Sequence, residues 1–161
     1  MKIPHISILI PVYNCSFCLE DLYDRLVKSV KKIDENFEII FINDCSPDNS
    51  WDIIEHLCNK DKRVRGIKLS RNFGQQISIS AGFEFAKGDW IVVMDCDLQD
   101  PPEEINKLYS KTKEGYELVI GFSKFRGKKG FLRNTSRKIF FKLYNLFSDY
   151  PVPSHLGTNS M

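Results

Sequence analysis

The chain has 161 residues, of which 42% are apolar and 27% are charged. This balance is typical of a globular domain with its own core and argues against an intrinsically disordered chain. A formal net charge of +2 gives no reason to expect a nucleic-acid partner. The sequence lacks both a bilayer-length apolar run and a signal-peptide pattern, and its five unevenly spaced cysteines do not resemble a secreted disulfide framework. We therefore expect a protein of the reducing cytosol.

The basic residues are concentrated in one segment of the chain. Residues 124–142 contain eight Lys and Arg residues and no acid, so the remainder of the chain is mildly acidic. Aromatic side chains are interleaved with these charges, a pattern found in helices that lie on anionic membrane surfaces. This segment predicts contact with an anionic membrane surface, and the alternative is a solvated basic face.

Predicted strands and helices alternate along the chain. In chain order they are strand 6–11, helix 19–33 with Ser16 as its N-cap, strand 37–43, helix 48–58, strand 64–69, helix 75–86, strand 90–94, a helix opening at Pro101, strand 117–121 and helix 131–147. Buried strands separated by helices predict an α/β fold. Its sheet would be mostly parallel, doubly wound and Rossmann-like, with helices on both faces. We expect a single domain over residues 1–161, truncated at its C-terminal end.

Two carboxylates follow the predicted strand 90–94. In extended backbone, residues i and i+2 project to the same side, so Asp95 and Asp97 would share one face. Such a pair suits Mg²⁺ or Mn²⁺ and leaves coordination positions open for a substrate diphosphate. Gln99 continues this face and adds a neutral oxygen. The alternative is a solvated acidic turn, because the Asp-x-Asp pattern is common by chance.

Other polar residues follow the remaining predicted strands. Ligands of open parallel sheets bind beyond the carboxyl ends of the strands. There Asp44 can accept the N–H of a nucleobase, Tyr13 offers an aromatic face, and the guanidinium of Arg71 suits phosphate oxygens. The alternative is a turn or cap residue for Asp44, an ordinary turn aromatic for Tyr13 and a surface salt bridge for Arg71. The combination predicts a nucleotide site.

Cys15 and Cys18 have the spacing of a redox dithiol at a helix start. Two small buried residues are the favoured interpretation, because no Trp precedes Cys15 and no second pair completes a zinc site. A redox module remains an alternative. A phospho-receiver domain would need an acid pair after the first strand, and Pro11-Val12-Tyr13-Asn14 supplies none.

Four motifs resemble the family 2 inverting glycosyltransferases. They are Ile-Pro-Val-Tyr-Asn at 10–14, Ile-Asn-Asp-Cys-Ser-Pro-Asp-Asn-Ser at 42–50, Ser-Arg-Asn-Phe-Gly-Gln-Gln at 70–76 and Met-Asp-Cys-Asp-Leu-Gln-Asp-Pro-Pro-Glu at 94–103. The last two are most similar to the polyprenyl-phosphate sugar transferases, such as dolichol-phosphate mannose synthase and the undecaprenyl-phosphate glycosyltransferases. The resemblance implies a GT-A fold. It also implies transfer of a sugar from a UDP- or GDP-sugar to a polyprenyl phosphate at the cytoplasmic face of the membrane.

The resemblance further implies roles for individual residues. The nucleotide would be held by Pro11, Tyr13, Asn14, Asp44, Arg71 and Asp95, and a divalent metal by Asp95, Asp97 and Gln99. Arg126 and Arg133 would contact phosphates of the donor or acceptor. The catalytic set would therefore be Asp95, Asp97, Arg126 and Arg133.

The sequence departs from the family pattern at two places, and the second bears on the acceptor. Asn43 replaces the first acid of the usual Asp-Asp pair, and residues 156–159 lack the acid often discussed as a general base. A phosphate acceptor is mostly dianionic at neutral pH and needs no base, whereas a sugar hydroxyl normally does. A lipid-phosphate acceptor is therefore favoured. The alternatives are a sugar-to-sugar transferase of surface polysaccharide and a non-catalytic nucleotide-binding domain. A homo-oligomer and membrane helices in a longer chain are further expectations.

Overall fold

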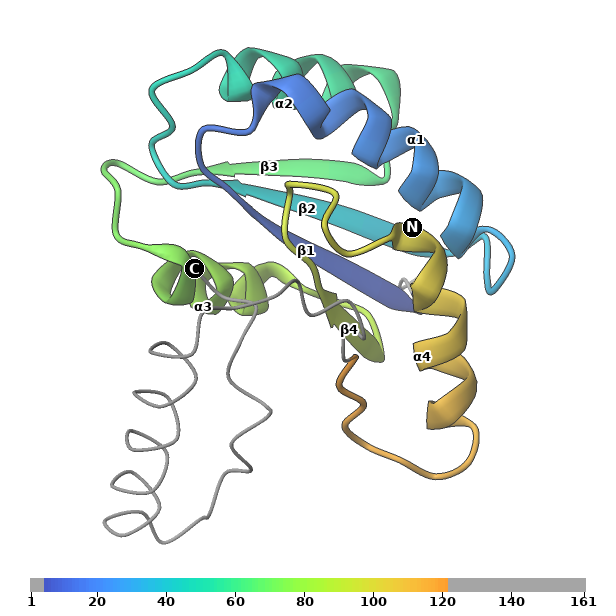
Figure 1. The fold of residues 1–161 in the computed structure, drawn as a ribbon. Helices are drawn as coiled ribbons and strands as arrows, with labels where there is room; N and C mark the ends of the chain where they lie inside the picture. The colour runs from blue at the N-terminus through green and yellow to red at the C-terminus, as the bar shows by residue number, and fades with distance from the viewer. Residues whose placement is uncertain (1–4, 122–161) are drawn as a thin grey trace, which may run out of the picture. The chain divides into compact units, whose positions relative to one another are not determined.

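The computed structural model describes residues 5–121 (Figure 1). The chain divides into two units, Met1–Val119 and Ile120–Met161, and the helices and strands below belong to the first. The predicted helix 131–147, the basic segment 124–142, Arg126 and Arg133 lie outside the described residues. The expectation of a single domain over residues 1–161 stays a prediction.

Four strands form one parallel sheet in the order β3-β2-β1-β4. They are β1 (Ile6–Val12), β2 (Phe37–Asn43), β3 (Val64–Lys68) and β4 (Trp90–Val93). The two central strands, β1 and β2, are buried at every position, as their nearly continuous apolar sequences predict. Because all neighbouring strands run in the same direction, the loops that follow them lie along one edge of the sheet. The predicted α/β fold with a parallel sheet is confirmed.

Helices cover both faces of the sheet (Figure 1). On one face lie α1 (Leu19–Val30), preceded by the short 3₁₀ helix η1 (Ser16–Cys18), and α2 (Ser50–Lys60). The opposite face is covered by α3 (Gln75–Phe85). After β4, the 3₁₀ helix η2 (Pro102–Glu104) leads into α4 (Ile105–Thr112), whose Ile105 joins the core beneath α1.

The alternation of side chains along the central strands divides the core between the two faces. Ile8 and Ile10 point into the larger cluster with α1 and α2, whereas Leu9 packs with Ile42 against α3. The helix α3 approaches the sheet closely because residue 82 is glycine. A Cβ there would lie 3.0 Å from Cδ1 of Ile42 and 3.3 Å from Cδ1 of Leu9.

Several predicted boundaries are wrong. Residues 117–121 form no strand, because apolar and β-branched sequence alone does not supply a neighbouring strand to pair with. The helix predicted over 19–33 ends at Val30, and Ser16 starts η1 instead of capping α1. The strand β4, expected to be buried, lies at the edge of the described sheet with Ile91 and Val93 partly exposed. Within residues 5–121, no helix is both long and apolar enough to cross a membrane.

Candidate functional site

Each of the four loops at the carboxyl edge of the sheet contains a residue with positive φ. These residues are Asn14 (φ 54°), Cys45 (52°), Gly74 (90°) and Leu98 (61°). Glycine adopts this conformation freely, but a non-glycine residue there is uncommon and costs roughly 1–2 kcal/mol. Such strain concentrates at functional sites, where the surrounding contacts hold it in place. The shared backbone feature marks this edge as the candidate site.

Side-chain hydrogen bonds fasten the loop after β1 to the loop after β2. The backbone N–H of Asn14 donates to Oγ of Ser46 at 2.6 Å, and the N–H of Ser16 donates to Oδ2 of Asp48 at 2.8 Å. Burial alone would raise the pKa of Asp48, but hydrogen bonds from Ser46, Ser50 and Ser16 outweigh it and hold that pKa well below its ordinary value. The ionised carboxylate of Asp48 therefore holds the two loops together at this edge.

Asn43 contributes to the same turn as a neutral residue. Its side chain is buried, and its Oδ1 accepts the backbone N–H of Ser46 at 3.0 Å. An amide oxygen makes this bond without placing a second charge beside Asp44. The replacement of an acid by Asn43 is thus compatible with a well-ordered loop.

Asp44 fastens the loop after β2 to the loop after β3. Its side chain is 3% exposed, and its two carboxylate oxygens accept the backbone N–H groups of Phe73 and Gly74, each at 2.8 Å. Hydrogen bonds to an ionised acceptor are among the stronger ones in proteins. Each oxygen retains a further lone pair, so the predicted nucleobase contact stays a prediction beside this structural role.

Asp95 and Asp97 are the predicted metal ligands, which we call the metal pair. They follow β4 in a turn over residues 95–99, the metal turn, instead of the expected extended backbone. Residues 96–99 bend because Oδ1 of Asp97 accepts the backbone N–H of Gln99 at 3.0 Å and Leu98 is left-handed. The two carboxylates nonetheless interact electrostatically. Burial raises the pKa of Asp95, and the negative charges of Asp97 and Asp100 raise it further.

The residues of this turn fit a divalent metal. Among residues 5–121, no Lys, Arg or His forms an ion pair with Asp95, Asp97 or Asp100. The pKa of Asp95 therefore stays raised, although the hydrogen bond from Gln75 lowers it in part. The same residues contain no cluster of three or more His, Cys, Asp or Glu side chains able to hold a metal by themselves. Mg²⁺ is commonly bound by one or two carboxylates together with substrate phosphates and water, which is the donor set available here.

Three buried thiols pack the start of η1 against the metal turn. The Sγ atoms of Cys15 and Cys18 are 3.0 Å apart, and the thiol of Cys18 donates to the carbonyl oxygen of Cys96 at 2.7 Å. The hydrogen bond with Cys96, together with burial, raises the pKa of Cys15, and burial raises the pKa of Cys18. Redox dithiols instead have a lowered thiol pKa. All five cysteines are free thiols, and the packing interpretation fits their environment.

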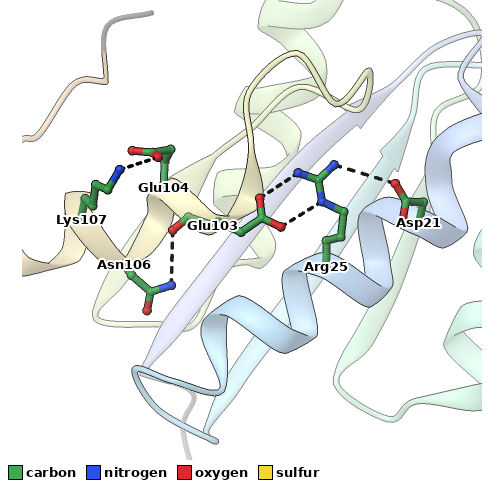
Figure 2. A network of polar contacts seen from close by, with 6 residues as sticks. All are labelled: Asp21, Arg25, Glu103, Glu104, Asn106 and Lys107. Carbon is green, nitrogen blue, oxygen red and sulfur yellow. Dashed lines mark hydrogen bonds and ion pairs between the residues drawn. The ribbon is translucent and has the colours of Figure 1, made fainter.

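An ion pair anchors the segment after the metal turn to α1 (Figure 2). Arg25 donates from Nε to Oε1 of Glu103 at 3.0 Å and from Nη2 to Oε2 at 2.8 Å. Asp21 lies 3.8 Å from Nη1 of the same guanidinium, and Asn106 donates to the carbonyl oxygen of Ser29 at 3.2 Å. The segment between β4 and α4 is thus held by specific contacts at both ends, since the N–H of Met94 also donates to the carbonyl of Leu9.

The remaining predicted ligand residues lie at the same edge in different settings. Pro11 is buried in β1, and its missing N–H is tolerated because the ladder with β4 already ends at Leu9. Tyr13 is 52% exposed at the strand end. Arg71 is exposed, and its Cζ lies 4.6 Å from the ring centroid of Phe73; within residues 5–121 it forms no ion pair. Gln99 is exposed beside Asp97. Their ligand roles stay predictions.

Sequence reasoning missed three residues that organise this edge, namely Ser46, Asp48 as an inter-loop acceptor, and Gln75. Nε2 of Gln75 donates to Oδ1 of Asp95 at 2.5 Å. The only sequence signal was the place of each residue within a strand-end motif. A motif does not reveal which loop its side chains reach, because that depends on the strand order.

The sequence matches known proteins over nearly its full length. The profile described as "Glycosyl transferase family 2" matches residues 7–161. The uncharacterized glycosyltransferase YkcC of Bacillus subtilis is 40% identical over 151 residues, which cover 94% of this chain and 47% of YkcC. The undecaprenyl-phosphate 4-deoxy-4-formamido-L-arabinose transferase of Proteus mirabilis is 40% identical over 139 residues, covering 86% of this chain and 42% of that protein. The chain therefore spans about half the length of the curated relatives it matches.

Solved structures with the same fold include TarS and a mannosyltransferase. Residues 1–349 of TarS from S. aureus align with a TM-score of 0.59 at 24% identity, over 78% of this chain and 38% of TarS. The mannosyltransferase PcManGT of Pyrobaculum calidifontis, solved with GDP-Man and Mn²⁺, aligns with a TM-score of 0.55 at 16% identity, over 63% of this chain and 30% of PcManGT. These similarities show a GT-A type of fold. The match of the family profile over residues 7–161 shows that the chain belongs to glycosyl transferase family 2.

Proposed function

We propose that this chain carries the donor-binding part of an inverting glycosyltransferase that moves a sugar from a UDP- or GDP-sugar to a polyprenyl phosphate. The observation that carries the proposal is the turn with Asp95 and Asp97, whose carboxylates form no ion pair among the described residues, at the edge where four strand-end loops meet. Relatives about 40% identical are named undecaprenyl-phosphate sugar transferases, which supports the lipid-phosphate acceptor. In those relatives, the complete reaction is assigned to a longer chain.

In the proposed site, different loops bind different parts of the donor. Tyr13 and Asp44 would hold the nucleoside, and the guanidinium of Arg71 would contact phosphate oxygens. Asp95 and Asp97, with Gln99, would hold Mg²⁺ or Mn²⁺ on the diphosphate. The metal, when bound, would neutralise the charge that accumulates on the departing nucleoside diphosphate.

The contacts between the loops explain how the site would contribute to catalysis. In the proposed reaction, an acceptor oxygen forms a bond to the anomeric carbon while the bond to the diphosphate oxygen breaks on the opposite side, with inversion. Groups that are already fixed stabilise the developing charge without reorganising during the reaction. The bonds made by Asp44, Asp48 and Gln75 fix the loops before the donor arrives. Arg126 and Arg133 stay predicted phosphate contacts, because they lie outside the described residues.

The acceptor decides between the two enzyme proposals. A polyprenyl phosphate brings its own nucleophilic charge, whereas a sugar hydroxyl needs a general base. The predicted membrane contact of residues 124–142 would bring the protein to the surface where a lipid-linked acceptor lies. The location on the inner face of the membrane is part of this proposal.

A two-stage experiment tests the proposed function. First, the melting temperature is measured with UDP-, GDP- and dTDP-sugars, each with Mn²⁺, Mg²⁺ or a chelator, since a ligand of the folded state raises it by mass action. We expect one nucleotide class to stabilise the protein only with metal. Second, the donor so identified is offered with a polyprenyl phosphate or with a sugar acceptor. Absence of any metal-dependent shift would contradict the proposal, and transfer to sugar alone would favour the polysaccharide transferase.

A further inference from the structure

The side-chain amide of Gln75 touches one member of the metal pair. Gln75 is the first residue of α3, in the connection that leaves β3, and Asp95 follows β4. These strands are the two edges of the described sheet, with β2 and β1 between them. The bond from Nε2 of Gln75 to Oδ1 of Asp95 thus joins loops that are distant along the sheet edge. No donor from the described residues reaches Oδ2 of Asp95, so one oxygen is held while the other is left for a ligand.

The backbone that carries Gln75 is itself fixed by Asp44. The bonds from the N–H groups of Phe73 and Gly74 to the Asp44 carboxylate end the loop directly before α3. Gly74 adopts a φ of 90°, which a side chain would strain, and its carbonyl accepts both the N–H and the hydroxyl of Ser78. Asp44, Gly74 and Gln75 therefore form a continuous connection between the predicted nucleoside end of the site and the predicted metal end.

We propose that Gln75 is a positioning residue of the donor site, whose amide orients the carboxylate of Asp95 toward the metal. The Asp44–Gly74 contact fixes the backbone that carries this amide. This inference rests on the proposed function, because it presupposes that Asp95 is a metal ligand. An amide suits this role since it donates a directional hydrogen bond without adding charge beside Asp97 and Asp100. Partners that orient a metal ligand typically contribute about 10–100-fold to metal affinity or activity when they are removed.

The neighbouring Gln76 supplies a matched control. Both glutamines lie in the first turn of α3, but the side chain of Gln76 is exposed, and among the described residues it has no hydrogen-bonding partner. The variants Gln75→Leu and Gln76→Leu therefore remove the same amide from the same helix turn. Gln75→Asn is a second test variant, because its amide is retained on a side chain one methylene too short to reach Asp95.

The experiment measures Mn²⁺ affinity by calorimetry at a saturating concentration of UDP or GDP, whichever binds the parent. It also measures nucleotide affinity and melting temperature in chelator. We expect Gln75→Leu and Gln75→Asn to weaken Mn²⁺ binding by about 10–100-fold while both metal-free quantities stay near those of the parent. Gln76→Leu should match the parent throughout.

Two results would overturn this inference and leave the proposed function standing. One is unchanged Mn²⁺ affinity in both Gln75 variants. The other is a loss of metal-free nucleotide binding and melting temperature that accompanies the loss of Mn²⁺ affinity, since that would show a general structural role. If the parent itself binds no Mn²⁺ with either nucleotide, the proposed function and this inference both fail.

Discussion

Arg25 of α1 and Glu103 of η2 form a two-bonded ion pair across 78 positions of sequence. Glu103 is the last residue of the motif that begins at Met94, and the pair fastens that motif to α1 (Figure 2). The hydrogen bonds from Arg25 lower the pKa of Glu103 from 4.5 to about 2. The final acid of the motif therefore has a structural partner and is distinct from the metal pair.

The lowered pKa of Glu103 predicts a pH-dependent contribution to stability. Because the folded-state pKa lies below the unfolded value, the pair stabilises the protein above about pH 4.5, and this contribution is lost as the pH falls toward 2. The side chains are partly exposed, so we expect Glu103→Gln to lower the free energy of unfolding at pH 7 by about 0.5–1 kcal/mol. Urea unfolding between pH 3 and 7 measures the difference, which should shrink below pH 4.5.

Glu104→Gln is the control for this prediction. Glu104 pairs with Lys107, three residues on, at an exposed surface, and this pair makes no connection to α1. We expect its effect at pH 7 to be smaller than that of Glu103→Gln. Equal effects, or a difference that persists unchanged at pH 3, would show that the Arg25–Glu103 pair does not anchor the motif.

The metal pair predicts that Asp97→Asn abolishes the metal-dependent part of nucleotide binding. Asp97 is exposed, so the variant should fold with the melting temperature of the parent in chelator. A ligand present at 100 times its dissociation constant stabilises the parent by about 2.7 kcal/mol, and with Mn²⁺ and a nucleoside diphosphate the variant should lose this increment. Glu104→Gln, an exposed acid outside the turn, should keep it. Undiminished metal-dependent stabilisation in Asp97→Asn would show that Asp97 only forms the turn and does not bind the metal.

The fold was predictable because its signals are local. The apolar runs of β1 and β2 are buried at every position, which short sequence windows already indicate. The error at residues 117–121 has the opposite origin, since an apolar run becomes a strand only when another strand pairs with it. Helix ends such as Val30 depend on contacts in the last turn, and these are not encoded in periodicity.

The candidate site was predictable only as a set of positions. The rule that ligands bind at the carboxyl edge of a parallel sheet identified Asp44 and Asp95 from their places in the sequence. Their partners were not predictable, because the acceptor role of Asp44 and the reach of Gln75 depend on how the β3–α3 loop crosses the sheet edge. The extended backbone expected at Asp97 was wrong for a local reason, since an Asp side chain often bonds the N–H two residues on and forms a turn.

The thiol cluster predicts a stabilising role for Cys18. Replacement by Ala removes the S–H bond to the carbonyl of Cys96 and leaves a small cavity, so we expect Cys18→Ala to lower the free energy of unfolding by about 1 kcal/mol. Cys45→Ala, at an exposed position, should have little effect. Treatment of the parent with oxidised glutathione should leave Cys15 and Cys18 reduced. A reversible disulfide between them under these conditions would instead support the redox alternative.

The dual contacts of Asp44 predict that Asp44→Asn weakens both nucleotide binding and folding. The substituted amide presents one oxygen and one NH₂ group to two backbone donors, so one N–H of the 73–74 segment loses its acceptor. Leaving a buried donor unsatisfied costs about 1–3 kcal/mol, and because these N–H groups are partly buried we expect a loss at the lower end of that range. Nucleotide binding in chelator should weaken as well, because the predicted nucleobase acceptor is altered, and calorimetry without metal measures this loss separately from the metal site.

Asp61→Asn separates these two effects. Asp61 accepts hydrogen bonds from Arg63 and Tyr23 before β3, at the opposite edge of the sheet, and the guanidinium of Arg63 lowers its pKa to about 2. This variant should also destabilise the fold, because the partners of Asp61 lose an ionised acceptor, yet it should bind nucleotide with the affinity of the parent. If Asp44→Asn is destabilised but keeps its metal-free nucleotide affinity, Asp44 acts only on the loop that carries Gln75. If both variants lose nucleotide affinity in proportion to stability, the loss reflects unfolding, and Asp44 has no direct contact with the base.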